Sequence, residues 1–186
     1  DDDGEQTGRR RQLLRPAAQQ YDVDETHEQC AEIHKHNAGP IVHVTRSMAP
    51  LMIDTADALT AFANSAASAN ALSLDTEFMR EKTYRAELCL LQIAAGDRAA
   101  CIDPLAIPDL SVLAPLLGAS GGVKIMHAAR QDLEVLLPAV GMVQPVFDTQ
   151  IAAALAGHPS QVGYGELVRR LLGVELAKAH TRADWS

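Results

Sequence analysis

The stretch LSLDTEF, residues 72–78, carries two acidic residues inside an otherwise apolar segment. In a β-strand, successive side chains point to opposite faces of the sheet. One face would then carry Leu72, Leu74, Thr76 and Phe78. The opposite face would carry Asp75 and Glu77, with their Cα atoms about 6–7 Å apart. Two like charges on a half-buried surface are costly unless a cation or a functional need holds them there, so the stretch predicts a core strand with a functional acid pair.

The composition predicts one domain, and it gives little sign of a membrane-spanning segment or of a surface that binds nucleic acid. A chain of 186 residues with 47% hydrophobic residues can bury one core. No apolar run reaches membrane-spanning length, no segment resembles a signal peptide, and we see no sign of a protein partner. The net charge of −8 argues against a nucleic-acid partner, because phosphates normally meet a basic surface. That objection weakens if the acidic residues bind metal ions, which reverse the local charge.

Residues 1–47 differ from the rest of the chain. They contain an acidic start and a basic cluster without sustained helical or strand periodicity, which predicts a disordered or linker segment. The first methionine is Met48, and we expect the folded domain to span residues 48–186. Cys89 and Cys101 lie in apolar surroundings, so we expect buried thiols in a reducing compartment, the cytoplasm.

Within residues 48–186 the hydrophobic pattern predicts alternating strands and helices. Strands are expected at 51–53, 71–78, 88–95, 99–102, 122–127 and 146–147, the third and fourth joined by a Gly-Asp turn. Helices are expected from about 54 to 67, where Asp54 or Thr55 can act as the cap, around 110–117, after 127, from 148 to about 157, and before Gly173. A hairpin followed by alternating helices and strands is typical of an α/β fold with a mixed sheet flanked by helices.

A third acid, Asp132, stands in the stretch MHAARQDLEVLL, residues 126–137. It lies early in a helix that leaves the carboxyl end of a strand, which is where such sheets place their ligand sites. The positive end of the helix also favours an acid there. Asp75, Glu77 and Asp132 could thus converge on one pocket. Three carboxylates without a Cys or His pair favour Mg²⁺ or Mn²⁺ over zinc, and such clusters serve two-metal phosphoryl displacement.

Each feature also has a purely structural interpretation. The acid pair could lie on an exposed edge strand, and Asp132 could be no more than a helix-start acid. His127 fits a packed histidine better than a metal ligand. Asp148 and Thr149 are better explained as the N-cap of a helix, so we leave them out of the site.

Three stretches resemble the ribonuclease D family. LSLDTEFMREKTYRAELCLLQIA (72–94) looks like its first exonuclease motif with the following hairpin, and KIMHAARQDLEVLL (124–137) resembles its second motif. The stretch from 145 to 186 is similar to the approach to the third motif. The resemblance covers about residues 50–186 in the expected order. It implies a ribonuclease H-like fold and a 3′→5′ exoribonuclease that trims the 3′ ends of tRNA precursors using two divalent ions, Mg²⁺ or Mn²⁺.

The resemblance also implies roles for individual residues. Asp75 and Glu77 match the metal ligands of the first motif, and Asp132 matches that of the second. Asp75 would bridge both ions. His127 matches a histidine near the site, and we assign it to substrate binding together with Thr76 and Phe78.

The chain departs from the family at its end. The third motif, a Tyr-x-x-x-Asp helix with a fourth carboxylate, does not occur among these residues, so we expect a fragment that is incomplete at its C-terminus. Such a fragment should bind RNA 3′ ends and hydrolyse them poorly. Two alternatives stay open, namely a DNA-directed 3′→5′ exonuclease and a non-catalytic nucleic-acid-binding module on the same fold.

Overall fold

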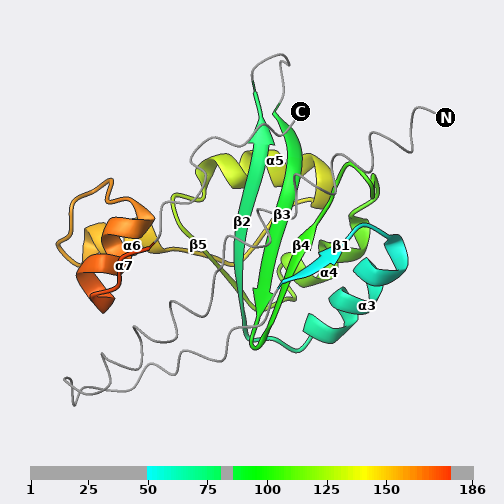
Figure 1. Cartoon of the computed structure of the whole chain (residues 1–186), viewed down its shortest axis with the longest axis horizontal. Coiled ribbons are helices and arrows are strands. Elements are labelled where there is room, and N and C mark those ends of the chain that lie inside the picture. Colours follow the sequence, from blue (N-terminus) through cyan, green and yellow to red (C-terminus); the bar gives the residue numbers. More distant parts are fainter. Residues whose placement is uncertain (1–49, 81–85, 177–186) are drawn as a thin grey trace.

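A six-stranded mixed sheet organises the chain in the computed structural model, which describes residues 50–80 and 86–176. The strand order is β1-β4-β3-β2-β5-β6 (Figure 1). The strands are β1 (Leu51–Ile53), β2 (Ala71–Met79), β3 (Glu87–Ala95), β4 (Arg98–Ile102), β5 (Val123–Met126) and β6 (Val146–Asp148). Strand β3 pairs antiparallel with β2 and with β4. The remaining pairs are parallel: β1 with β4, β5 with β2, and β6 with β5. The expected mixed sheet is confirmed.

Helices α3 (Ala56–Ala66) and α5 (Arg130–Val140) are the longest in the described residues. Thr55 caps α3 as expected, with its hydroxyl accepting from the backbone N–H of Ala58. In Figure 1, α5 crosses the sheet behind β2 and β3, with which it is in contact. At the far side of β5 and β6 lie α6 (Thr149–Leu155) and α7 (Tyr164–Leu172), the latter ending at Gly173 in the left-handed conformation.

The helix expected at 110–117 is shorter and less regular than the sequence pattern suggested. It consists of a 3₁₀ turn, η1 (Ser111–Leu113), followed by the single-turn helix α4 (Ala114–Leu117). Pro115 has no backbone N–H to donate into a preceding turn, so a continuous α-helix would lose a hydrogen bond there. The leucines still face inward, because Leu113, Leu116 and Leu117 are all buried.

The alternation predicted for LSLDTEF is confirmed through residue 76. Leu72, Leu74 and Thr76 are buried, whereas Ser73 and Asp75 are exposed. After Glu77 the register with β3 shifts by one residue, which is a β-bulge that ends the strict alternation. Glu77 and Phe78 are both half-buried as a result.

One core residue departs from the apolar pattern. Lys124, on β5, is fully buried. Its ammonium group donates to the carbonyl of Gly118 at 2.9 Å, and desolvation lowers its pKa. Cys89 and Cys101 are buried thiols as expected, and burial raises the pKa of Cys101 to about 11. None of the helices in the described ranges is long and apolar enough to cross a bilayer.

The expectation for the segment 1–47 falls on residues outside the described ranges. The domain boundary at residue 48 therefore stays a prediction.

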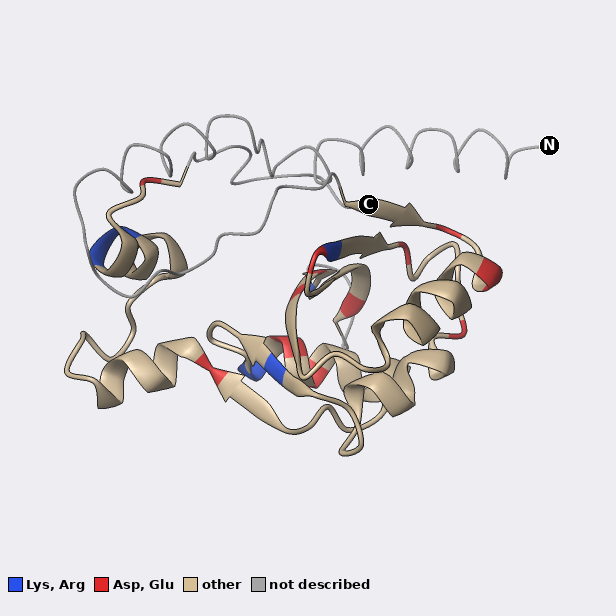
Figure 2. Ribbon diagram, turned by 90° about the horizontal axis from the view of Figure 1, so that it is seen from below, with Lys and Arg blue, Asp and Glu red and all other residues tan. Residues whose placement is uncertain are grey.

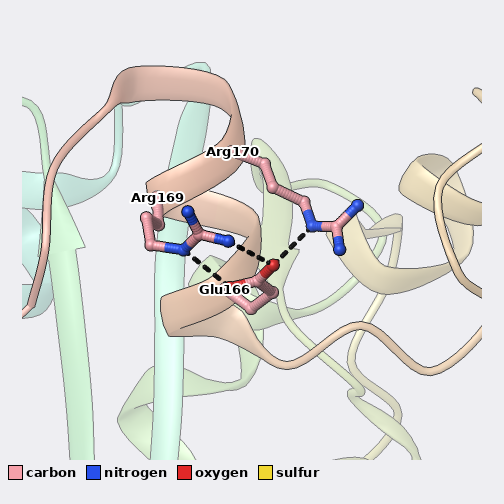
Figure 3. A network of polar contacts seen from close by, with 3 residues as sticks. All are labelled: Glu166, Arg169 and Arg170. Carbon is pink, nitrogen blue, oxygen red and sulfur yellow. Dashed lines mark hydrogen bonds and ion pairs between the residues drawn. The ribbon is translucent and has the colours of Figure 1, made fainter.

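A compact ion network occupies the surface of α7. Glu166 accepts from both arginines of the last turn, at 2.8 Å from Arg169 and 2.6 Å from Arg170 (Figure 3). Hydrogen bonds from these guanidinium groups lower the pKa of Glu166 to about 2. Because the three side chains are partly exposed to solvent, dissolved salt weakens the attraction between their charges.

The network gives a pH prediction for Glu166→Gln. A carboxyl group whose pKa is lowered on folding stabilises the protein above its ordinary pKa near 4.5, and that contribution disappears as the pH falls towards 2. We expect the variant to melt slightly below the parent at pH 7 in low salt. The difference should vanish near pH 2 and in 1 M NaCl, as followed by circular dichroism. A difference that is independent of pH and salt would mean that the ion pairs do not stabilise α7.

Candidate active site

The predicted acids lie on two elements that are in contact, strand β2 and helix α5. Thr76, on the buried face of β2, donates its hydroxyl hydrogen to Asp132 Oδ1 at 2.5 Å. This bond fixes the Asp132 side chain from α5 directly against the strand that carries Asp75 and Glu77. The substrate-binding role predicted for Thr76 stays untested, but the side chain is largely buried and its hydroxyl is used to orient an acid.

The carboxyl groups interact electrostatically. Asp75 remains accessible to solvent, yet enough protein surrounds its carboxyl group that desolvation, followed by repulsion from Asp132, raises its pKa to about 6. The pKa of Glu77 is raised by desolvation and then by the charges of Asp75 and Asp132. All three acids therefore lie within reach of one another's charge, and their ionised forms destabilise each other.

The acids do not form a closed coordination shell. Among residues 50–80 and 86–176, no three His, Cys, Asp or Glu side chains lie close enough together to hold a metal ion. The donor set nevertheless fits a hard divalent cation, because carboxylate oxygens are the ligands such ions prefer. Desolvation, and after it repulsion between the carboxylates, raises the pKa of Asp75 and Glu77, and a bound positive charge would relieve that repulsion.

His127 is held by the protein through both ring nitrogens. Nε2 lies 2.9 Å from the carbonyl oxygen of Val162, which only accepts, so this nitrogen carries the hydrogen. Nδ1 lies 2.9 Å from the hydroxyl of Thr149, and the ring of Tyr164 packs edge-on at 5.6 Å between centroids. The interpretation of His127 as a packed histidine thus matches the geometry, with two bonded nitrogens rather than one. Its assignment to substrate binding stays a prediction.

An aromatic and a basic side chain extend the site along β2. The guanidinium of Arg80 lies over the ring of Phe78, 5.4 Å from its centroid. Arg80 also donates to Glu134 on α5 at 3.2 Å, and Arg130 reaches the same carboxylate at 3.4 Å. These bonds connect the end of β2 to α5 beyond the acids.

An open groove of about 710 Å³ lies beside α5 but is not the acid site. It runs between α5, β6 and α6 and is mostly apolar, lined among others by Leu133, Phe147 and Ile151. None of Asp75, Glu77 and Asp132 lines it.

A protein-family model described as 3′-5′ exonuclease matches residues 50–186, which include β2, α5 and the three acids. The chain belongs to this exonuclease family. Ribonuclease D from Acidiphilium cryptum is 45% identical over 139 residues, which are 74% of this chain and 36% of that protein. The resemblance of this exonuclease-family chain to ribonuclease D is therefore confirmed.

Two solved structures are similar to this chain in both fold and sequence. The crystal structure of Escherichia coli RNase D, described as an exoribonuclease involved in structured RNA processing, superposes with a TM-score of 0.70 and 42% identity, covering 74% of this chain and 37% of that one. Brucella melitensis NrnC with bound Mg²⁺ gives a TM-score of 0.55 and 35% identity, covering 64% of this chain and 60% of that one. The exonuclease-family chain thus spans little more than a third of the length of the ribonuclease D proteins it matches.

The sequence named Thr76 and His127 as site residues but did not reveal their hydrogen-bond partners. The Thr76–Asp132 bond joins residues 56 positions apart, and the bonds of His127 reach 22 and 35 positions along the chain. The sequence contained one indication of the contact between Thr149 and His127. Asp148 and Thr149 stand at the end of strand β6, which pairs in parallel with β5, the strand before His127. Polar residues at the ends of neighbouring parallel strands meet at one edge of the sheet.

Proposed function

We propose that the complete protein is a 3′→5′ exoribonuclease of the ribonuclease D type. It would remove nucleotides from RNA 3′ ends, with tRNA precursors as the expected substrates and the cytoplasm as its compartment. The observation that carries this proposal is the acid group of β2 and α5, in a chain of the exonuclease family. Thr76 on β2 binds Asp132 on α5, and desolvation, followed by repulsion from Asp132, raises the pKa of Asp75 to about 6.

The distribution of basic residues favours metal ions as the phosphate-binding groups. In the ribbon of Figure 2, the Lys and Arg residues of the described part are dispersed over separate elements. Lys124 is buried in the core. The arginine that follows β2 and those on α5 and α7 are engaged with two glutamates, in the pairs Arg80–Glu134, Arg130–Glu134, Arg169–Glu166 and Arg170–Glu166. A phosphodiester approaching Asp75 would meet negative charge, which divalent cations on the carboxylates would reverse.

Each residue of the site would have a distinct task. Asp75, Glu77 and Asp132 would hold two Mg²⁺ or Mn²⁺ ions, and Thr76 orients the Asp132 carboxylate through its hydroxyl. Bound divalent ions lower the pKa of water and stabilise the departing 3′ oxygen. Water adds to phosphorus, the bond to the 3′ oxygen breaks, and that oxygen takes a proton. The released product is a nucleoside 5′-monophosphate, and the half-buried ring of Phe78 offers an apolar surface to a base.

The test uses 5′-labelled single-stranded RNA and DNA of identical sequence with the natural full-length protein in Mn²⁺. We expect stepwise shortening of RNA from its 3′ end, release of nucleoside 5′-monophosphates, and slower cleavage of DNA. For the 186-residue chain alone we expect RNA binding with severely reduced hydrolysis. Preferential cleavage of DNA would favour the DNA-directed alternative. Binding of RNA without any hydrolysis by the full-length protein would favour a non-catalytic module.

A further inference from the structure

The carboxylate of Asp148 binds two separate segments of backbone. As the N-cap of α6, its Oδ1 accepts from the N–H groups of Gln150 at 2.8 Å and Ile151 at 3.4 Å. The same carboxylate also accepts from Ala128 at 3.1 Å and, through Oδ2, from Ala129 at 2.9 Å. A helix cap needs only the first pair. The second pair reaches the turn that connects β5 to α5.

That turn has an unusual conformation. Ala128 has a φ of +56°, and it is the only non-glycine residue with positive φ among the described residues. For an L-residue with a Cβ atom this conformation is sterically unfavourable. It persists only where the surroundings hold it, and such positions concentrate at functional sites. The Asp148 carboxylate accepts both amide hydrogens that this conformation turns towards β6.

The turn determines where α5 begins. Ala129 is the N-cap residue of α5 and has no side chain that could accept from the first turn. Asp148 is brought to this turn because β5 and β6 pair so that Met126 lies opposite Asp148. It accepts from the N–H groups of Ala128 and of Ala129 itself, and so holds the residues that lead into the helix. Asp132 is the third residue of α5. Asp148 therefore anchors the backbone just before the helix turn that carries Asp132, and Thr76 holds the Asp132 side chain.

Thr149, the residue after Asp148, connects the same two parts of the chain. Thr149 donates its hydroxyl hydrogen to the carbonyl of Met126 at 3.0 Å and lies 2.9 Å from His127 Nδ1. Two consecutive residues at the start of α6 thus hold three consecutive residues, 127–129, before α5. The four backbone N–H groups outweigh desolvation and lower the pKa of Asp148, so it is ionised at neutral pH.

We propose that Asp148 is a positioning residue that sets the start of α5 and thereby the place of Asp132 relative to Asp75 and Glu77. This role rests on the proposed function, in which the three acids bind divalent ions. It is separate from the N-cap role in α6, because it acts through the N–H groups of Ala128 and Ala129.

The decisive variant is Asp148→Asn, which keeps one carbonyl acceptor and loses the charge and the second oxygen. We expect the affinity of the folded protein for Mn²⁺, measured by calorimetric titration, to fall roughly 10-fold, as is usual when an outer partner of a metal ligand is lost. In the full-length protein, kcat on RNA should fall by a similar factor while KM changes little. In the metal-free protein, amide hydrogen exchange at Ala128, Ala129 and the first turn of α5 should accelerate.

A rescue variant separates positioning from general destabilisation. Glycine adopts the conformation of Ala128 without steric cost, so Asp148→Asn combined with Ala128→Gly should regain part of the lost Mn²⁺ affinity. The matched control is Asp103→Asn. Asp103 is also a buried carboxylate, and it accepts from the backbone N–H groups of Leu105 and Ala106 in the loop after β4, two strands away from β2. The control should lower the melting temperature and leave Mn²⁺ affinity unchanged.

The outcomes are distinguishable. Unchanged Mn²⁺ affinity in Asp148→Asn, or an equal loss in Asp103→Asn, would overturn the positioning role while leaving the proposed function intact. If the parent protein itself binds no Mn²⁺ and degrades no RNA, the proposed function fails. Amide hydrogen exchange of Asp148→Asn then still tests the positioning role. Unaltered exchange in the first turn of α5 would show that Asp148 does not set the start of that helix.

Discussion

Replacing Asp75 by asparagine should abolish function and stabilise the metal-free protein at the same time. The amide keeps the size of the side chain and removes a charge that burial and Asp132 disfavour, which is why the pKa of Asp75 is raised to about 6. We expect hydrolysis of RNA by the full-length protein to fall on the order of 100-fold or more, as when a main electrostatic group of an active site is lost. Without divalent ions, the melting temperature at pH 7 should rise above that of the parent.

Asp97→Asn is the matched control for this prediction. Asp97 is an exposed acid in the turn between β3 and β4, away from α5. The control should keep both the rate of RNA hydrolysis and the melting temperature. If metal-free Asp75→Asn melts at a lower temperature than the parent, the ionised Asp75 carboxylate does not destabilise the metal-free protein, and this prediction is wrong. Hydrolysis at the parent rate would remove Asp75 from the site altogether.

The second large effect concerns the helix that carries Asp132. Leu136 on α5 has no exposed surface and belongs to the main core beneath β2 and β3. Leu136→Ala should lower the free energy of unfolding by about 2–5 kcal/mol, through the lost burial and the cavity left behind. Urea denaturation followed by circular dichroism measures this difference.

The adjacent leucine provides the control. Leu137 lies on the same helix, but 55% of its surface is exposed. Because the chemical change and the helix are the same, Leu137→Ala should change the free energy of unfolding by no more than about 0.5 kcal/mol. Similar losses in both variants would show that helix formation, rather than burial against the sheet, determines the contribution of α5.

Local patterns were sufficient to predict most elements of the fold. Period-two alternation identified β2 and its two faces through Thr76, and the Gly-Asp pair located the turn between β3 and β4. Capping residues placed the starts of α3 and α6. These features depend on interactions within a few residues, so they can be read without knowing the rest of the structure. The 110–117 segment was less predictable, because its leucine spacing does not distinguish a helix from a 3₁₀ turn followed by one helical turn.

The amino-acid sequence by itself determined which residues are candidates for chemistry. The acids Asp75 and Glu77 follow from strand alternation, and Asp132 from its place early in a helix after a strand. Only the tertiary structure decided how these acids are held. The hydroxyl of Thr76 on Asp132, both ring nitrogens of His127, and the carboxylate of Asp148 on the turn before α5 join residues 19 to 56 positions apart.

The physical reason is that side-chain hydrogen bonds depend on distances of about 3 Å, which are fixed by how strands pair and helices pack. A pattern of periods and caps predicts elements, but the partner of a side chain in a distant element is not part of that pattern. Asp148 illustrates the difference. Its sequence context predicts a helix cap, which the structure confirms, and only the pairing of β5 with β6 brings the same carboxylate to the turn that carries α5.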